Sequence, residues 1–294
     1  MVDEIKVSIC VVTYNQEDYI AECLQSLVDQ KTDFPFEVIV GEDYSTDKTR
    51  VIIEDFSDRY PNLIVKNFQK TNVGPAQNIL SSYLLARGKY ICHMDGDDRA
   101  LPGKIQAQSL YLDENSDCNV IWSRAKILDD KTGKMHDDLL NSRSVLGRKI
   151  SKRDLLLFGS VACHSSKMFR AKTLREHCLP EHDFLDFYLD VLQIGEGYGC
   201  IASEFFCVYR SGVGISGSEK TKDLFLSNMQ RLLEVEVDCR PYASANLLKF
   251  FLAEVKNGKV NSRAFSMFLK TFRLRTIFYF FRSLIYVKYF RSPI

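Results

Sequence analysis

The stretch KYICHMDGDDRALPG, residues 89–103, places three carboxylates, Asp95, Asp97 and Asp98, directly behind a short apolar run. The run has the composition of a buried strand, whereas Asp is disfavoured inside strands and neighbouring acids repel one another. A Pro and a Gly then end the extended segment. We therefore predict that a buried strand ends here and that the acids serve a ligand site at its carboxyl end.

The segments before this stretch predict a parallel sheet. Strands are expected at 7–15, 36–43 and 62–68, and helices between them at 16–30, 45–60 and 74–88, with Ser45 or Thr46 as the N-cap of the second helix. Apolar strands without polar alternation, separated by helices, are typical of an α/β fold with a mostly parallel central sheet covered by helices. Ligands bind such sheets at the carboxyl ends of the strands.

Three of these strand ends carry unusual polar residues: Thr13-Tyr14-Asn15, Glu42-Asp43, and the acids that begin at Asp95. The first strand is followed by TYNQED, so neither GxGxxG nor GxxxxGK[ST] is present to hold phosphates with a glycine-rich backbone. Oxygen ligands suit hard cations such as Mg²⁺ or Mn²⁺. Asp95 and Asp97 could therefore face one metal ion that carries a diphosphate.

The same acids have a simpler interpretation as turn residues. Asp98 in particular could be the N-cap of a helix that begins near Pro102. The DxD pattern alone does not decide between the two interpretations. The polar residues at the neighbouring strand ends favour the metal site.

Composition limits the class of protein. Of the 294 residues, 46% are hydrophobic and 26% are charged, as in ordinary soluble globular proteins. The nine cysteines include no CxxC pair, so we expect reduced core thiols rather than disulfides or a zinc site. Asp3 and Glu4 interrupt the N-terminus before any apolar run, and no uninterrupted apolar run is long enough to span a bilayer. We expect a cytoplasmic protein.

The charge is divided unevenly along the chain. Residues 255–294 contain nine Lys and Arg and no acid, while the rest of the chain has a net charge of −8. Ten aromatic residues accompany the basic ones after position 264. Such a segment suits a helix that lies on an anionic membrane surface, and the acidic body argues against nucleic acid as the partner. We predict a peripheral protein on the inner face of the cytoplasmic membrane.

The tail leaves two points open. Drawn as one helix, its basic residues fall in a sector of roughly 80°, and these residues are Arg263, Lys270, Arg273, Lys288 and Arg291. Arg275 and Arg282 fall outside the sector, so the helix is expected to bend or break. The alternative is that the aromatic residues pack on the body of the protein and the charges form a solvated face.

Four segments resemble a known family in order and spacing: VSICVVTYNQEDYIAECLQSLVDQ, FEVIVGEDYSTDKT, NVGPAQN and GKYICHMDGDDRALPGKI. They resemble the inverting family 2 glycosyltransferases, clearly over about residues 6–125 and more weakly to about 217. The resemblance implies the nucleotide-diphospho-sugar transferase fold called GT-A, with a nucleotide-sugar half at about 1–125, an acceptor half at about 126–220 and a helical extension at 221–294. It also implies a nucleotide-sugar donor, usually a UDP-sugar, a Mn²⁺ or Mg²⁺ ion, and a glycan or lipid-linked acceptor in cell-surface polysaccharide synthesis.

The resemblance also assigns site residues. By family position, the nucleotide-sugar site would comprise Thr13, Tyr14, Asn15, Glu42, Asp43, Asn78, Asp95, Gly96 and Arg210. Asp43 would bind the base edge, and Asp95 and Asp97 would serve the ribose and the metal-bound diphosphate. Two departures from the family pattern concern this site: Tyr44 stands where a glycine is usual, and Gln77 stands where an arginine is common.

Inverting transfer also needs a general base that takes the proton of the acceptor hydroxyl. The segment LDFYL most resembles the start of the family helix that supplies it, so Asp186 is expected to be the base, with Asp183 in reserve. The alternative is that these are helix-start acids, which the helix dipole favours. His93 is expected to be a core residue, and His164 lies in a segment that is near the acceptor in the family.

Two rival functions remain on sequence grounds. A sugar nucleotidyltransferase shares a similar sheet, but it would need a glycine-rich, basic loop after the first strand, where this chain has TYNQEDYI. The second rival is a membrane-recruited nucleotide-binding module without catalysis. Metal-dependent turnover of a nucleotide sugar separates that module from the enzyme.

Overall fold

The computed structural model describes residues 4–140, 146–175, 179–213 and 219–286. Its first part alternates strands and helices: β1 (Val7–Thr13), α1 (Ile20–Val28), β2 (Phe36–Glu42), α2 (Thr49–Arg59), β3 (Ile64–Phe68), α3 (Pro75–Leu85) and β4 (Tyr90–Asp95). All three strand pairings within this part, β1 with β2, β1 with β4 and β2 with β3, are parallel. The predicted parallel sheet is therefore present in this half.

The second part of the sheet is mixed. Its elements are β5 (Arg99–Ala100), α4 (Lys104–Glu114), β6 (Cys118–Asp129), β7 (Met135–Asp137), α5 (Lys152–Phe158), the 3₁₀ turn η1 (His164–Ser166), β8 (Met168–Arg170), α6 (Lys172–Arg175), α7 (Asp186–Ile194) and β9 (Tyr198–Ser211). The strand order is β3-β2-β1-β4-β8-β6-β9-β5, with β7 on β6. Strand β8 is antiparallel to both β4 and β6, while β6 and β9 are parallel. The first four strands and the pair β6–β9 are therefore parallel, as predicted, while β5, β7 and β8 add antiparallel pairings.

Each face of the sheet carries its own core. Ile9 and Val11 of β1 pack with buried residues of α1, α2 and α4, whereas Cys10 and Val12 face α3, α5 and α7. Successive strand residues point to opposite faces, which explains why a strand buried on both sides is apolar throughout. No disulfide joins the described cysteines, and all except the half-buried Cys163 are buried.

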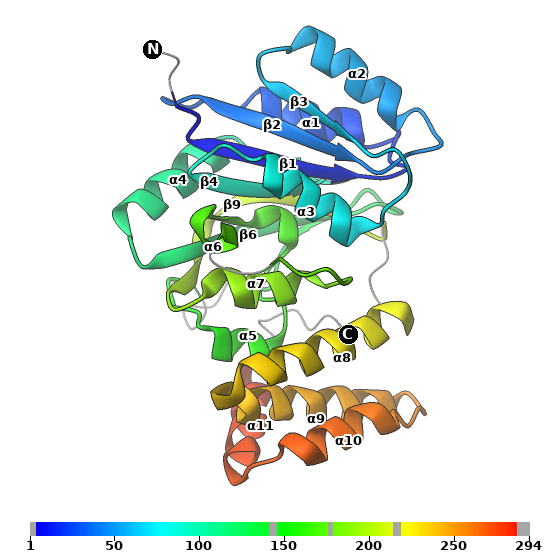
Figure 1. The fold of residues 1–294 in the computed structure, drawn as a ribbon, viewed down its shortest axis with the longest axis vertical. Helices are drawn as coiled ribbons and strands as arrows, with labels where there is room; N and C mark the ends of the chain where they lie inside the picture. The colour runs from blue at the N-terminus through cyan, green and yellow to red at the C-terminus, as the bar shows by residue number, and fades with distance from the viewer. Residues whose placement is uncertain (1–3, 141–145, 176–178, 214–218, 287–294) are drawn as a thin grey trace.

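The C-terminal part is a layer of helices: α8 (Glu219–Val235), η2 (Val237–Cys239), α9 (Arg240–Lys256), α10 (Ser262–Thr271) and α11 (Leu274–Tyr286). Figure 1 shows this layer beneath α5 and α7, on the far side of the molecule from β3. Phe225 of α8 contacts Phe187 of α7 on one side and Phe250 of α9 on the other, with ring centroids 5.4 and 5.3 Å apart. The helical layer therefore shares its core with α7 of the second part. Within the described residues, every helix is too short or too polar to cross a bilayer.

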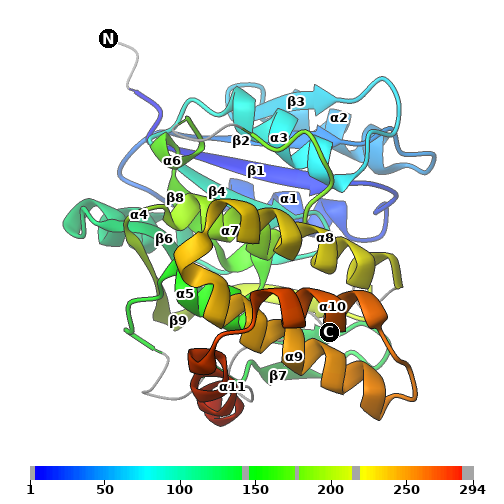
Figure 2. The same cartoon turned by 60° about the horizontal axis from the view of Figure 1, so that its bottom comes forward.

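The tail is not one helix. α10 ends at Thr271 and α11 begins at Leu274, and Figure 2 shows α11 turning out of the line of α10. The expected break is present, since the Arg273 backbone N–H donates to the Thr276 hydroxyl at 3.1 Å instead of continuing α10. The tail therefore does not form the single helix on which the basic sector was drawn. Lys288 and Arg291, two residues of that sector, lie outside the described residues.

The predicted N-cap of α2 is also wrong. The helix begins at Thr49, whose backbone N–H donates to Asp47 Oδ1 at 2.9 Å. Ser45 Oγ instead accepts from the backbone N–H of Asn15 at 2.9 Å, and the Thr46 N–H donates to Asn15 Oδ1 at 2.8 Å. Ser45 and Thr46 therefore connect the loops after β1 and β2, at the candidate site, and do not cap α2.

Candidate active site

The three polar strand ends lie at one edge of the sheet. Strand β1 pairs with both β2 and β4, and the register places Thr13 beside Glu42. The backbone N–H of Asp43 donates to the Thr13 carbonyl at 3.1 Å, and that of Gly96 donates to the Val12 carbonyl at 2.9 Å. The convergence expected from the sequence is therefore present.

Gly96 lies against the end of β1 at a point where no side chain fits. A Cβ atom on Gly96 would lie 2.5 Å from Gln16 Oε1 and 2.8 Å from the Thr13 Cβ. Thr13 Oγ1 in turn donates to Gln16 Oε1 at 2.7 Å. The glycine between Asp95 and Asp97 thus allows both acids to approach the first strand.

The protein offsets the negative charge of Asp97 only in part, through Arg210 and Gln16. Its pKa is raised to about 6, mainly because the carboxyl is buried and further because Asp95 is charged. Two oxygen-bearing side chains that repel each other fit a hard divalent cation, which would offset their charge. The residues present are therefore suited to the Mg²⁺ or Mn²⁺ ion that the pattern predicts.

Asp98 has a different role from its neighbours. Its side chain is buried, and Oδ1 accepts from the backbone N–H of Arg210 at 2.7 Å. Burial raises the pKa of Asp98 well above its usual range, and the charges of Asp95 and Asp97 add to the rise. The alternative that Asp98 caps α4 is wrong, because the N-cap of that helix is Gly103.

A second group of potential metal ligands lies beside Asp95. Ligand atoms of His93, Asp95 and His164 all lie within 4.8 Å of one another. Both ring nitrogens of His93 already have partners, the Tyr83 hydroxyl at 2.9 Å and Asp95 Oδ1 at 3.0 Å. Burial also lowers the pKa of His93, so it is a satisfied core histidine, as expected. We therefore place the candidate metal site at Asp95 and Asp97 rather than between the imidazoles.

Two tyrosines are exposed at neighbouring strand ends. Tyr14 is 45% and Tyr44 48% exposed. Tyr44 has φ of 63° and the adjacent Asn15 has φ of 50°, the left-handed region that a tyrosine rarely adopts. Strained backbone of this kind is concentrated at ligand sites. Sequence reasoning noted Tyr44 only as a missing glycine and did not propose it as a site residue.

Glu42 and Asn78 lie beneath the surface. Glu42 is completely buried; its carboxylate accepts from Arg50 Nε at 2.6 Å and from the Ser45 backbone N–H. Asn78 is 2% exposed and donates to the Gly41 carbonyl at 2.8 Å. Both residues were expected to bind the nucleotide sugar. In this structure both side chains are buried, Glu42 against Arg50 and the loop after β2, and Asn78 against β2.

Asp43 is likewise buried, at 2% exposure. Its two carboxylate oxygens accept from the backbone N–H groups of Val73 at 2.7 Å and Gly74 at 2.9 Å. Asp43 thus fixes the loop between β3 and α3 against the end of β2. Each oxygen retains a further lone pair.

Arg210 joins the two halves of the sheet at this edge. Its guanidinium contacts Glu22 Oε2 at 2.8 Å and Asp130 Oδ1 at 3.1 Å, and Nε donates to the Asp97 carbonyl at 3.0 Å. The ring of Tyr19 lies 4.6 Å beneath it. Arg210 is therefore next to the acids, as expected, but its charge is already shared by two carboxylates.

Asp183, Asp186 and Asp190 lie in the segment that is expected to supply the general base, and of these three Asp186 is the one that contacts His164 of the histidine cluster. It is the first residue of α7, its side chain is 47% exposed, and His164 Nδ1 lies 3.2 Å from its Oδ1. Its pKa is raised to about 7, first by desolvation and then by the charges of Asp95 and Asp190.

The other two acids of this segment are placed differently. Asp190 is buried in an ion pair with Lys167 at 2.7 Å. Asp183 is exposed and lies outside α7, before its first turn. Asp186 does stand in a first helical turn, as the helix-start alternative requires, yet its pKa is shifted upward, which a helix dipole would not do.

Comparisons with known proteins agree with this geometry. Residues 8–178 match the model of Glycosyl transferase family 2, which is more than half of the chain. An uncharacterised protein of Mycobacterium tuberculosis is 30% identical over 204 residues, 69% of this chain and 58% of that protein.

This chain belongs to glycosyl transferase family 2.

Two solved structures share the fold of this glycosyltransferase. TarS residues 1–349 of Staphylococcus aureus, in complex with UDP-GlcNAc, align with a TM-score of 0.67 and 21% identity over 91% of this chain and 79% of that chain. The mannosyltransferase PcManGT of Pyrobaculum calidifontis, in complex with GDP-Man and Mn²⁺, aligns with a TM-score of 0.55 and 15% identity over 97% of this chain and 74% of that chain. The fold is therefore GT-A, as the sequence predicted, while the chain spans 58% of the length of the mycobacterial relative.

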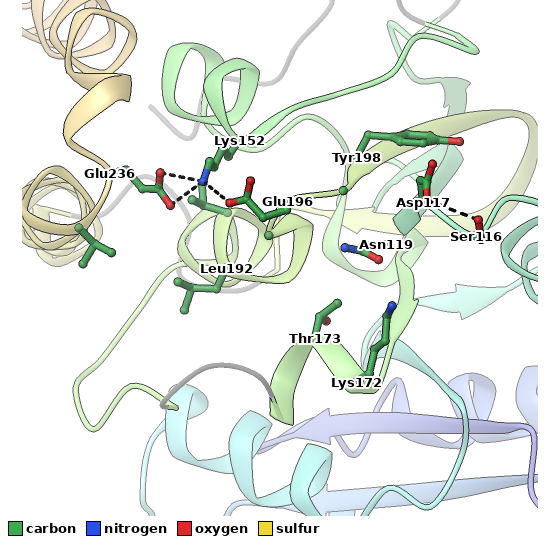
Figure 3. Close-up of a pocket in the computed structure, with 14 residues that line it drawn as sticks. Ser116, Asp117, Asn119, Lys152, Lys172, Thr173, Leu192, Glu196, Tyr198 and Glu236 are labelled. Atoms are coloured by element: carbon green, nitrogen blue, oxygen red, sulfur yellow. Dashed lines mark hydrogen bonds and ion pairs between the residues drawn. The ribbon is translucent and has the colours of Figure 1, made fainter.

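A cavity of about 570 Å³ lies away from the acids of the glycosyltransferase, between the starts of β6 and β9 and the end of α7 (Figure 3). Lys152 crosses one side of it and pairs with Glu196 and Glu236 at 3.2 and 2.9 Å. Asn119 donates to the Ile194 carbonyl at 2.9 Å. The polar groups of this cavity largely satisfy one another, and none of the predicted site residues lines it.

Proposed function

We propose that this glycosyltransferase moves a sugar from a nucleoside-diphosphate sugar, with a UDP-sugar favoured, to a hydroxyl of a glycan or lipid-linked acceptor, with inversion at the anomeric carbon. The observation that carries the proposal is the position of Asp186. It is a half-open carboxylate whose pKa is raised in part by the charge of Asp95, so the two acids border one site. Family membership makes sugar transfer the reaction class.

In the proposed reaction the acceptor oxygen attacks the anomeric carbon while the bond from that carbon to the diphosphate oxygen breaks. Asp186 takes the proton of the acceptor hydroxyl, and the nucleoside diphosphate leaves with the electron pair. A pKa of about 7 suits this role, because a base acts best when its pKa is close to the working pH. Asp183 stays in reserve, since it is more exposed and lies before the helix.

Asp97 and Asp95 would hold the divalent ion, which would stabilise the charge that grows on the leaving diphosphate. The Mn²⁺ named with the related mannosyltransferase supports this ion class. Thr13, Tyr14 and Asn15, with Tyr44 beside them, would contact the base and ribose. Asp43 would bind the base edge through its remaining lone pairs and Arg210 would border the diphosphate. The UDP-GlcNAc complex of TarS supports a uridine nucleotide.

We further propose that three segments of the chain have the separate roles that the resemblance implied. Residues 1–125 supply the strand-end acids that bind the donor, residues 126–220 supply Asp186, and residues 221–294 form the helical extension.

The extension would bind an anionic membrane surface, which would place the protein on the inner face of the cytoplasmic membrane. One face of α11 packs on the body: Tyr279 stacks on Tyr242 at 3.9 Å, and Thr276 and Ser283 are buried. The opposite face is apolar and exposed, and comprises Leu274, Ile277, Phe278, Phe281, Leu284 and Ile285. The aromatic residues are thus divided between the body and the surface.

Charge favours a lipid surface as the partner of this face. Arg273 and Arg275 are exposed beside the apolar face, and residues 255–286 contain no acid. Each Lys or Arg near anionic lipid adds about 1 kcal/mol of binding. An apolar helix face with flanking cations suits insertion at the level of the headgroups.

The membrane proposal is tested by co-sedimentation with vesicles that contain phosphatidylglycerol. The double variant F278S/F281S should lose binding without loss of stability, because both side chains are exposed. The matched control is L84S/V51S, which removes two equally exposed apolar side chains from α3 and α2. Equal binding by the two double variants, or none by the wild type at low salt, would refute the membrane proposal.

The transfer proposal is tested by Asp186→Asn. This variant should lose transfer while it binds UDP and Mn²⁺ as the wild type does, because the substitution removes the base and leaves the donor site intact. Loss in Asp183→Asn but not in Asp186→Asn would move the base to Asp183. Full activity in both variants would exclude this segment as the source of the base.

A further inference from the structure

We propose that His164 is a positioning residue, which holds the carboxylate of Asp186 by donating its Nδ1–H. This inference rests on the proposed role of Asp186 as the base. The contact measures 3.2 Å from Nδ1 to Oδ1, and the His164 side chain is only 4% exposed. The histidine would therefore act through Asp186, without touching the substrate.

The surroundings of His164 determine which nitrogen carries the proton. Burial lowers the pKa of His164 well below its usual range, and the neighbouring His93 and Lys167 lower it further, so the ring is neutral. A neutral imidazole has one N–H. Nε2 is buried without a partner, so a proton there would be an unsatisfied donor while Nδ1 turned a lone pair toward the carboxylate. The tautomer with Nδ1–H avoids both costs.

The donor fixes one oxygen of Asp186 and leaves the other for the acceptor. Oδ1 lies 3.2 Å from His164 Nδ1, while about half of the Asp186 side chain stays exposed. A hydrogen bond to the charged form also favours ionisation, which opposes the desolvation that raises the pKa of Asp186. His164 thus keeps the base both oriented and available.

The same segment ties the base to the acids of the donor site. The His164 ring stacks on that of His93, with centroids 3.6 Å apart and planes 24° apart, and His93 Nε2 lies 3.0 Å from Asp95 Oδ1. Ser165, the next residue, accepts from the Asp95 backbone N–H at 2.9 Å and donates to Oδ2 at 3.2 Å. Two stacked imidazoles therefore each contact one of the two acids.

A second contact anchors the helix that carries the base. Lys167 pairs with Asp190 at 2.7 Å, and Asp190 lies one turn after Asp186 on α7. His164 and Lys167 thus contact one face of α7 at two positions, Asp186 and Asp190, one turn apart. The ion pair can hold the helix in place by itself, so the His164 contact is left to set the direction of the carboxylate.

Three substitutions separate the hydrogen bond from packing. His164→Phe keeps a flat ring on His93 but has no donor. His164→Asn places an N–H the same number of bonds from Cβ as Nδ1, whereas His164→Gln places it one bond farther away. His136→Phe is the matched control, because His136 is exposed on β7.

The experiment measures Mn²⁺-dependent release of UDP from the best donor among UDP-glucose, UDP-galactose and UDP-N-acetylglucosamine. We expect His164→Phe to lower kcat by about 10- to 100-fold, a part of the usual effect of a general base. KM for the donor and Kd for UDP should stay within about twofold of wild type, because the donor is bound elsewhere. His164→Asn should recover most of kcat, and His164→Gln should recover less.

Wild-type kcat in His164→Phe, or equal kcat in His164→Asn and His164→Gln, would overturn the inference. The comparison of Asn with Gln also decides the matter if the Phe variant does not fold. Asp186→Asn is assayed alongside. If it is inactive while His164→Phe is fully active, only the positioning role of His164 fails. If it is active, Asp186 is not the base and the inference fails with that role. If the wild type releases no UDP, the proposed function fails and the inference with it.

Discussion

The backbone N–H of Arg210 donates to Oδ1 of Asp98 at 2.7 Å and so joins the ends of two strands that are 112 residues apart in the sequence. The contact brings the Arg210 guanidinium onto the Asp97 carbonyl at 3.0 Å. The acids that follow β4 are therefore held in place by a residue of β9. The candidate site depends on the second half of the chain as well as on the first.

Asp97→Asn should remove most sugar transfer and most Mn²⁺ binding. The amide is a weaker ligand for a hard cation, and it carries no charge to balance it. The fold should remain intact, because the substitution removes a charge that Asp95 repels. The measurements are UDP release with and without Mn²⁺ and the thermal midpoint. Asp33→Asn, an acid outside the site, is the control, and transfer at the wild-type rate by Asp97→Asn would contradict the metal assignment.

The pH dependence of kcat should report the ionisation of Asp186. Its folded pKa is raised to about 7, so the base is ionised above that pH and protonated below it. At saturating donor and Mn²⁺, kcat should be level above about pH 8 and fall about tenfold per unit below about pH 6. An activity that stays constant down to pH 5 would mean that no group of this pKa acts as the base.

Asp43→Ala should weaken UDP binding more than it slows the chemical step. The carboxylate accepts from the backbone N–H groups of Val73 and Gly74. Its loss therefore releases the loop between β3 and α3 and also removes the group proposed to bind the base. Two hydrogen bonds to a charged acceptor are lost, each worth about 1.5–3 kcal/mol. The thermal midpoint should therefore fall too. Calorimetric titration with UDP is the measurement, and an unchanged dissociation constant would exclude Asp43 from nucleotide binding.

Tyr44→Gly should have opposite effects on stability and on binding. Glycine adopts φ of 63° without the roughly 1–2 kcal/mol that other residues lose there. Removal of the exposed ring would also remove a surface on which a base can stack. We expect an equal or higher thermal midpoint together with weaker UDP binding. A variant that binds UDP as tightly as the wild type would show that Tyr44 has no part in the site.

Local patterns predicted the first half of the fold well. Strand β1 and its neighbours are apolar because they are buried on both faces, so their runs stand out in the sequence. The antiparallel insertion of β8 was not predicted, because Met168–Arg170 is three residues long and pairs with strands distant in sequence. Short strands with long-range partners carry almost no local signal.

The sequence pointed to the acids of the candidate site, but it did not indicate which residues around them are buried or in contact with them. Asp95 and Asp97 stand out because carboxylates are unusual at the end of a buried strand, whereas Asp186 was chosen because LDFYL resembles the family pattern. Burial is not visible in the sequence, so the complete burial of Glu42 was not predicted. The contact between His164 and Asp186 was missed for the same reason, since it joins two segments only through the fold.

The central claim is that the strand-edge acids and Asp186 together transfer a sugar from a nucleotide sugar. It is tested most directly by release of nucleoside diphosphate from a panel of UDP-, GDP-, CDP- and dTDP-sugars, with Mn²⁺ present or removed by chelator, for the wild type and Asp186→Asn. We expect the wild type to turn over one class of donor, the UDP-sugars, only with metal, and Asp186→Asn to bind that donor without turning it over. A wild-type protein that binds nucleotide but releases no diphosphate from any donor would contradict the account and leave a binding module in its place.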